Sequence, residues 1–253
     1  MIYVTLGFVA SIFNLFSMIV TTNPLTKLQV PVTSTMLVDL CTNLAPMAAI
    51  FVFMAPMPTI GKIRQSGSVG ALPLLPYSSM VGSTFLWTVY GLLVGEFKVW
   101  SPNFVGLVLG AYYMTCFMKY APKSAPTLPG SLRQHQTGVI AVMGATLLLA
   151  ATLAQPAAYI GPCGVTLTIA MFASPLSALR TVLQTKSAAS IPLPFTLASL
   201  ANCLFWSVAG LFKMKDANIY VPNLLGLTFS LVQAGLKLAY GDGPYGEATK
   251  LPT

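Results

Sequence analysis

The chain has 253 residues, of which 55% are hydrophobic and only 7% are charged. Soluble domains carry about 25% charged residues, so water cannot be the main solvent for this surface. The net charge of +8 comes from basic residues that stand singly, which argues against a nucleic-acid partner. Composition therefore indicates a protein embedded in membrane lipid.

The first apolar stretch, residues 2–20, precedes the rest of the pattern and is followed by a polar linker at 21–35. It is an extra span, an anchor or a cleaved signal. A signal peptide would show a basic start, a shorter apolar core and a small-residue cleavage site. The sequence has none of these, which favours an uncleaved span.

Seven further stretches reach the roughly 20 apolar residues that a membrane-spanning helix needs. They are residues 38–58, 74–95, 99–118, 137–157, 159–180, 193–213 and 219–238. Gly and Pro recur inside them, as is typical of membrane helices. We therefore predict an all-α membrane fold with seven transmembrane helices and the N-terminal apolar segment.

The basic residues also predict the orientation. Alternate loops on one side hold nine Lys or Arg residues and those on the other side hold four. The positive-inside rule places the first group in the cytoplasm, together with the tail from Gly241 to Thr253 and a loop that holds His135, the only histidine. The four cysteines lie in apolar spans without paired spacing, so we predict neither a disulfide framework nor a metal site.

A pattern in the first half of the chain recurs in the second half. The matching segments, 119 or 120 residues apart, are Trp87-Thr-Val-Tyr-Gly91 with Trp206-Ser-Val-Ala-Gly210, Pro102-Asn103 and Gly106 with Pro222-Asn223 and Gly226, and Pro56 with Pro175. Pro76 and Pro192 pair after a small difference in loop length. Each half is a three-helix unit, and the single helix between them makes the two bundles parallel.

The expected organisation follows from these repeats. It consists of an N-terminal extension at 1–37, a first three-helix repeat at 38–120, a linker with the fourth helix at 121–158, a second repeat at 159–240 and a cytoplasmic tail at 241–253.

Asn103, Asn223, Trp87 and Trp206 are the candidate binding residues. In each half, the Trp and the Asn fall at similar depth in consecutive helices. An amide offers both a donor and an acceptor to hydroxyl groups, and an indole offers an apolar face with one donor. Taken singly, each residue would more often be structural. Their duplication favours one site for a neutral polyol between the halves.

Four prolines occupy corresponding places near the cytoplasmic ends of the first two helices of each repeat: Pro56, Pro76, Pro175 and Pro192. Proline weakens a helix locally, so these four positions are candidate hinges. Pro76 and Pro192 follow loops, so the alternative for this pair is a helix start.

The acidic residues near the spans, Asp39, Glu96 and Asp216, lie close to predicted outer ends. Proton-coupled carriers use intramembrane Asp, Glu or His, so facilitated diffusion is the simpler expectation. The sequence shows no catalytic motif and no clustered carboxylates or Cys/His ligands. We predict neither an enzyme nor a cofactor.

Several motifs follow in a fixed order: Ala55-Pro56, Leu75-Pro76-Tyr77, Trp87, Tyr90-Gly91, Pro102-Asn103-xx-Gly106, Ser190-Ile-Pro192, Trp206, Asp216 and Pro222-Asn223-xx-Gly226. This series, over about residues 38–241, resembles the SWEET sugar-uniporter family. The resemblance implies two parallel three-helix bundles with a linker helix, and bidirectional transport of a mono- or disaccharide by alternating access.

The resemblance also implies residue roles. Asn103 and Asn223 would hydrogen-bond the sugar and Trp206 would stack on it, while Trp87 falls at a pocket position that varies among members. Val52 and Met171 would line the pocket. The remaining matches concern gating: Pro56, Pro76, Pro175 and Pro192 near a cytoplasmic gate, Tyr90 and Asp216 at an extracellular gate, and Gln233 in the last helix. Where some members have a gate lysine, this chain has Gly95 beside Glu96.

Two other functions stay open from the sequence. One is a PQ-loop carrier of another small solute. Such carriers have Gln after the key proline, whereas this chain has Tyr77 after Pro76 and Leu193 after Pro192, which counts against this function. The other is a non-transporting membrane scaffold. The expected location is the plasma membrane, with an endomembrane as the alternative, and assembly into a homo-oligomer is left open.

Overall fold

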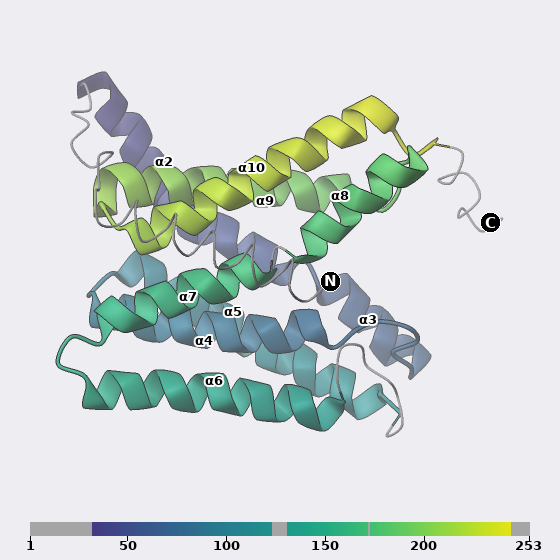
Figure 1. Ribbon diagram of the computed structural model, residues 1–253, viewed down its shortest axis with the longest axis horizontal. Helices are drawn as coiled ribbons and strands as arrows, with labels where there is room; N and C mark the ends of the chain where they lie inside the picture. Colours follow the sequence, from purple (N-terminus) through teal and green to yellow (C-terminus); the bar gives the residue numbers. More distant parts are fainter. Residues whose placement is uncertain (1–31, 123–130, 172, 244–253) are drawn as a thin grey trace. The chain divides into compact units, whose positions relative to one another are not determined.

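The computed structural model describes residues 32–122, 131–171 and 173–243, and these residues form helices joined by turns (Figure 1). The predicted extra span at residues 2–20 lies outside the described residues. In chain order the helices are α2 (Val32–Met54), α3 (Met57–Ser66), α4 (Leu75–Leu93), α5 (Phe97–Tyr120), α6 (Leu132–Thr152), α7 (Ala157–Met171), α8 (Ala173–Thr185), α9 (Leu193–Val208), the π-helix η2 (Ala209–Met214) and α10 (Ala217–Tyr240).

Three of the predicted spans are each formed by two helical elements, one of them, 193–213, by α9 and the π-helix η2. The stretch 38–58 lies in α2 and α3, which meet at a turn formed by Ala55 and Pro56, and the stretch 159–180 lies in α7 and α8. Proline cannot donate a backbone hydrogen bond, and its ring clashes with the preceding turn of a helix. The turn at Pro56 is the expected consequence.

The placement of His135 in a loop was wrong. Helix α6 begins at Leu132, before the predicted start at 137, and His135 lies buried in its first turns. The reason is a capping box, in which the Ser131 hydroxyl accepts from Gln134 N at 3.3 Å while the Gln134 side chain accepts from Ser131 N at 2.7 Å. This reciprocal pair satisfies two backbone N–H groups that otherwise lack partners at a helix start.

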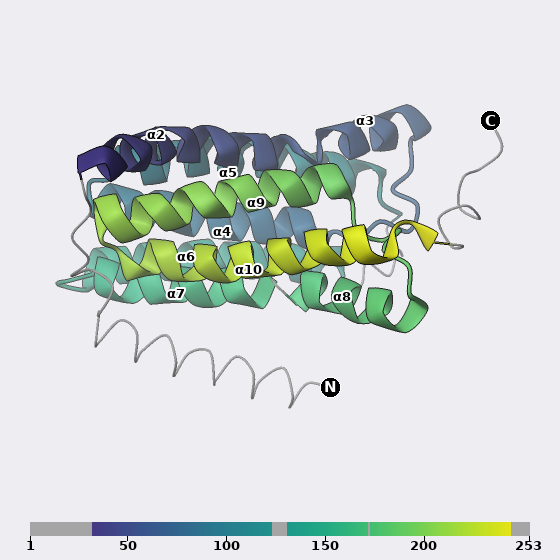
Figure 2. The same cartoon turned by 90° about the horizontal axis from the view of Figure 1, so that it is seen from above.

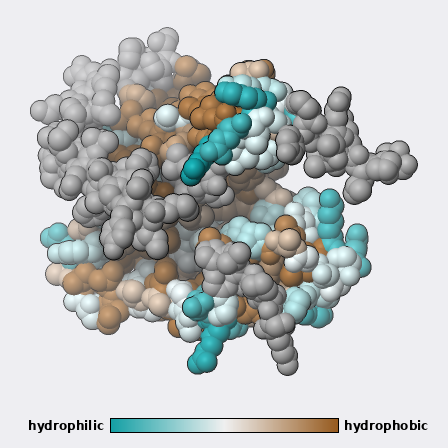
Figure 3. All heavy atoms as spheres, turned by 45° about the vertical axis from the view of Figure 1, so that its right-hand side comes forward, coloured by the Kyte–Doolittle hydropathy of each residue, from teal (hydrophilic) through white to brown (hydrophobic). Residues whose placement is uncertain are grey.

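The helices expose large apolar side chains, as a protein surrounded by lipid does. Figure 3 shows hydrophobic surface beside hydrophilic surface, and Leu238 is 86% exposed and Met36 79%. By length and composition, four helical segments of the described chain can cross a membrane: Thr35–Ser66, Leu132–Thr152, Leu193–Met214 and Ala217–Tyr240. Exposed apolar surface on this scale is unfavourable in water.

The described chain divides into two compact units. The first compact unit contains residues 49–164, and the second contains residues 32–48 and 165–243. In the first, α4 packs against α5 and α6, and α3 packs against α5; Figure 2 shows these helices from a second direction. In the second, α10 packs against α9, η2 and α8. Both α2 and α7 therefore begin in one unit and end in the other.

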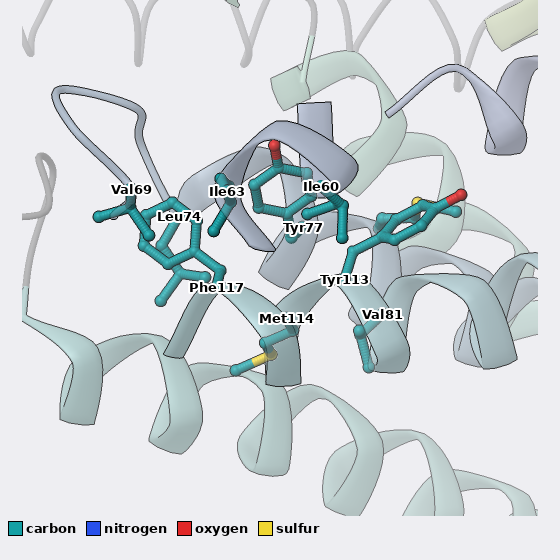
Figure 4. Close-up of a cluster of buried hydrophobic side chains, with 10 residues drawn as sticks. Ile60, Ile63, Val69, Leu74, Tyr77, Val81, Tyr113, Met114 and Phe117 are labelled. Carbon is teal, nitrogen blue, oxygen red and sulfur yellow. The ribbon is translucent and has the colours of Figure 1, made fainter. Parts of the chain in front are cut away.

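A buried apolar cluster fixes one end of the first compact unit (Figure 4). Its members come from α3, α4, α5 and the loop after α3: Ile60, Ile63, Val69, Leu74, Tyr77, Met80, Val81, Tyr113, Met114 and Phe117. The ring of Tyr77 lies edge-on to that of Tyr113, with centroids 6.2 Å apart. The Tyr113 hydroxyl donates to Phe53 O at 3.2 Å, which ties α5 to the end of α2 just before the turn at Pro56.

Polar contacts join the α8–α9 loop to the end of α10 in the second compact unit. The Lys237 ammonium donates to Ala188 O at 3.0 Å, and Ala188 N donates to Gly241 O at 2.9 Å. The Ser187 hydroxyl donates to Asp242 O at 2.8 Å. These bonds fix the loop that leads into Pro192 and α9.

Candidate functional site

The first half of the candidate site lies in the hairpin of α4 and α5. A Cβ added to Gly91 of α4 would lie only 2.6 Å from Trp100 N of α5, so glycine allows the two backbones to meet at this point. Trp87 precedes Gly91 by one helical turn, and its ring lies edge-on to that of Tyr90, with centroids 5.5 Å apart. The close approach therefore fixes the depth of Trp87 relative to α5.

The Trp87 ring also limits the space beside α7. A Cβ added to Gly164 would lie 3.0 Å from Trp87 Cζ2 and 2.6 Å from Leu86 Cδ2. A residue with a side chain at position 164 would displace the Leu86 side chain and press on the indole. Glycine here allows the first part of α7 to pack directly on the ring of Trp87.

Asn103 follows a proline inside α5. Its side-chain Nδ2 donates to Val99 O, one turn earlier, at 2.8 Å. Pro102 lacks a backbone N–H, and the Asn103 side chain bonds to the carbonyl next to the one that this proline leaves without its helical donor. Gly106 follows by three residues, and an added Cβ there would meet Phe53 at 2.7 Å and Thr84 at 2.9 Å. Residues of α2, α4 and α5 thus meet at Gly106, about one turn after Asn103.

The second repeat reproduces this geometry in α9, η2 and α10. A Cβ added to Gly210 would lie 2.8 Å from Tyr220 N, as Gly91 meets Trp100 in the first repeat. Trp206 is 6% exposed and precedes Gly210 by one turn. Asn223 follows Pro222 inside α10, and its Nδ2 donates to Ile219 O at 2.7 Å.

The two asparagines therefore have the same orientation within their own helices. Each amide donates one N–H to its own helix, and each retains a second N–H and a carbonyl oxygen. A hydroxyl group both donates and accepts, so it can bond to both of these groups at once. The expectation that Asn103 and Asn223 face one site stays a prediction, because they belong to different compact units.

The hairpins differ at their turns. Gly91 O accepts from Glu96 N at 2.9 Å, and Gly210 O accepts from Asp216 N at 2.9 Å, so the second turn encloses one more residue. The π-helix η2 accommodates that residue. This explains why the repeat is offset by 119 residues before the turn and by 120 after it.

The remaining predicted residues fall on both sides of these hairpins. Tyr90 is 3% exposed in α4, and Asp216 caps α10 by accepting from Asn218 N at 2.9 Å. Met171, the last residue of α7, is 40% exposed, Val52 is half-buried near the end of α2, and Gln233 is half-buried in α10.

The four prolines of the predicted hinges occupy different helical positions. Pro56 caps α3, Pro76 is the second residue of α4, and Pro192 caps α9. Pro175 is the third residue of α8. These positions begin helices, because a proline in the first turn loses no intrahelical bond.

Asn202 was not among the predicted site residues. It lies in α9 one turn before Trp206, and its buried Oδ1 has no hydrogen-bond partner in the described part of the chain. A buried acceptor without a partner is costly unless something else bonds to it. Its counterpart 119 residues earlier is Ser83, so the repeat comparison gave no amide signal there.

Two duplicated three-helix repeats in a helical membrane protein, each with an indole and an amide at the same place, define an internally repeated transporter fold. A family model described as "Sugar efflux transporter for intercellular exchange" matches residues 40–125 and 158–242. The chain belongs to this family, the SWEET family, as the resemblance predicted. Members of the family are transporters and not enzymes, in agreement with the prediction.

Individual relatives agree with this assignment. The bidirectional sugar transporter NEC1 of Petunia hybrida is 30% identical over 217 residues, which cover 82% of each chain. SWEET12 of Oryza sativa subsp. japonica is 30% identical over 194 residues, which cover 76% of this chain and 64% of that protein. This chain spans between 59% and 64% of the length of the first five such relatives.

The fold also matches a solved structure. That structure is of a eukaryotic SWEET transporter, with a TM-score of 0.68 and 26% identity. The match covers 81% of this chain and 98% of the other. The predicted all-α membrane fold with two repeats is confirmed, and the chain is an integral multi-pass membrane protein.

Proposed function

We propose that this chain carries a mono- or disaccharide across a membrane in either direction, by facilitated diffusion and alternating access. The observation that carries the proposal is the repeated hairpin geometry, in which a Trp one turn before a close glycine contact accompanies an Asn after a helical proline. The relatives named bidirectional sugar transporters support the same function.

In this proposal the amides of Asn103 and Asn223 bond to sugar hydroxyls with the N–H and carbonyl oxygen that their helices leave available. The rings of Trp206 and Trp87 provide apolar faces that pack on the sugar ring. Asn202 adds an acceptor in the second repeat only, which makes the site asymmetric. Val52 and Met171 set how much room the sugar has.

Gating belongs to the residues at the ends of the hairpins and helices. Pro56, Pro76, Pro175 and Pro192 act near the cytoplasmic side, at the points where helices begin. Tyr90 and Asp216 act at the opposite side, close to the two hairpin turns, and Gln233 acts from the last helix. The expected location is the plasma membrane, and the expected neighbours are membrane lipid and a second copy of the chain.

The positions of the acidic residues support transport that is not coupled to the proton gradient. In residues 32–122, 131–171 and 173–243, Glu96 and Asp216 cap helices, Asp39 is half exposed and Asp242 follows the last helix. The proposal therefore predicts that sugar flux persists when the proton gradient is collapsed. Strict dependence on that gradient would overturn uniport and direct attention to the buried His135.

Uptake of labelled glucose and sucrose into vesicles that hold the purified protein tests the function. Removing one amide bond to a hydroxyl costs about 0.5–1.5 kcal/mol, so Asn103→Ala and Asn223→Ala should each raise KM roughly 2- to 12-fold. The matched control is Thr228→Ala in α10. The exposed Thr228 hydroxyl also donates to a carbonyl one turn earlier, Leu224 O at 2.9 Å. The Thr228→Ala variant therefore loses the same kind of helix bond, but outside the site.

Unchanged KM in both asparagine variants would contradict the proposed site while leaving sugar transport intact. Equal losses in both variants and in the control would assign the effect to helix stability. No flux of either sugar from the wild type would favour a carrier of another solute or a scaffold.

A further inference from the structure

An ion pair connects two helical segments that belong to different repeats. The Lys213 ammonium lies 2.7 Å from Asp39 Oδ1, and the two side chains are 54% and 53% exposed. Asp39 lies in α2, the first helix of the first repeat, and Lys213 lies in η2, at the end of the second hairpin's first arm. Both residues belong to the second compact unit.

The position of the pair along the membrane normal follows from the second hairpin. Lys213 precedes Asp216, the N-cap of α10, so the pair lies at the level of the α9–α10 turn. In the orientation predicted from the basic residues, this turn is at the outer face. The outer part of α2 is therefore bound to the outer turn of the second repeat.

The second turn has one more residue than the first and carries the lysine. Between Gly91 and Glu96 the first repeat has Leu92, Leu93, Val94 and Gly95, none of which carries a charge. Between Gly210 and Asp216 the second repeat has one residue more, and the π-helix that contains it presents Lys213. The ion pair is thus a feature of one turn and has no counterpart in the other.

We propose that Asp39 and Lys213 form an outer clasp, an ion pair that favours the conformation in which the outer face of the carrier is closed. The inference rests on the proposed function, because alternating access requires the outer ends of the two repeats to separate. Separation of α2 from η2 breaks the pair and returns both charges to water. The clasp differs from Tyr90 and Asp216 because it joins the second hairpin, through Lys213, to α2, through Asp39.

An exposed ion pair is weak, and a weak bond suffices here. A pair of this exposure changes an equilibrium by roughly 1.4- to 5-fold. A carrier must cross between its two conformations in every cycle, so a strong clasp would stop transport. A bond of this size shifts the balance between the conformations without preventing the exchange.

The test measures KM for sugar separately from the outer and inner sides of intact cells. Breaking the clasp raises the outward-open population, so Lys213→Gln and Asp39→Asn should each lower the ratio of outer KM to inner KM roughly 1.4- to 5-fold. The swapped double variant, Asp39→Lys with Lys213→Asp, should restore the wild-type ratio. The control Lys215→Asn removes an exposed charge two residues away and should leave the ratio unchanged, since asparagine tolerates the left-handed backbone there.

A second measurement does not depend on sugar. Cys41 lies two residues after Asp39 and is half-buried, so labelling of this thiol by a membrane-impermeant maleimide from outside should be faster in Lys213→Gln than in the wild type. An unchanged KM ratio together with unchanged labelling, or a swap that fails to restore the wild-type values, would overturn the clasp. If the wild type shows no sugar flux, the proposed function is refuted. In that case the clasp is tested only by the rates at which Cys41 is labelled in the wild type and in Lys213→Gln.

Discussion

Substituting alanine for Gly91 tests whether the hairpin geometry positions the candidate site. The added Cβ would lie 2.6 Å from Trp100 N, where ordinary contacts begin at 3.4 Å, so the helices must separate by about 0.8 Å. The obstructing atom belongs to the backbone and cannot rotate away. Overpacking of this kind costs about 1–3 kcal/mol.

The same substitution at an open glycine supplies the reference. Alanine stabilises a helix interior by about 0.5–1 kcal/mol relative to glycine, wherever the position lies. Gly144 in α6 has nothing within 4 Å of an added Cβ, so Gly144→Ala gains that term alone. The difference between the two variants then isolates the steric cost.

Thermal unfolding in detergent and sugar uptake are the two assays. At about 2–4 °C per kcal/mol for a chain of this size, Gly91→Ala should melt roughly 2–12 °C below Gly144→Ala. Its KM should also rise, because Trp87 and Asn103 lie on opposite arms of the separated hairpin. If Gly91→Ala is as stable as Gly144→Ala and transports normally, the helices do not meet as described and the explanation of the site geometry fails.

Three further predictions follow from single contacts. Asn202→Leu should leave the free energy of unfolding unchanged or raise it by about 1 kcal/mol, since it removes a buried acceptor without a partner, while KM for sugar rises; a drop in stability with unchanged KM would contradict this. Ser78→Ala should lower the free energy of unfolding by about 1–3 kcal/mol, because the buried His135 Nδ1 loses its 2.8 Å hydrogen bond. The double variant with His135→Leu should regain most of that stability, as measured by thermal unfolding. Lys215→Gly should raise stability by about 1 kcal/mol by relieving a positive φ of 54°, and an unchanged melting temperature would count against strain at that turn.

Much of the fold could be predicted because duplication is visible in sequence. The positions of Trp87 and Trp206, and of Asn103 and Asn223, follow from the repeat alone. In the structure both asparagines make the same bond to their own helix, and both tryptophans lie one turn before a close glycine contact. Whether the two asparagines face one common site depends on packing between segments far apart in the chain. Sequence periodicity within a helix carries no information about that.

The missed features have local physical causes. The start of α6 was placed too late because its signal is a polar capping box, Ser131 to Gln134, ahead of the apolar run. The Asp39–Lys213 pair was missed because the two residues are 174 positions apart and belong to different repeats. The π-helix did have a signal, the step in repeat offset from 119 to 120, since one additional residue in a helix must enlarge one turn.

The two hairpins have the same geometry near the Trp and Asn residues, where one sugar would need two similar contact surfaces. They differ in geometry at their turns. Gly91 and Gly210 allow the same close approach, yet the first turn closes with Gly95 at a φ of 72° and the second with Lys215 at 54° after an additional residue. Removing that residue should therefore affect the turn and the clasp while leaving the Trp and Asn positions intact. A variant that lacks Leu211, one of the five residues between Gly210 and Asp216, gives this turn the length of the first; it should lose the Lys213–Asp39 pair and shift the KM ratio in the same direction as Lys213→Gln, with sugar selectivity unchanged. A change in selectivity would mean that the turn and the binding residues are not independent.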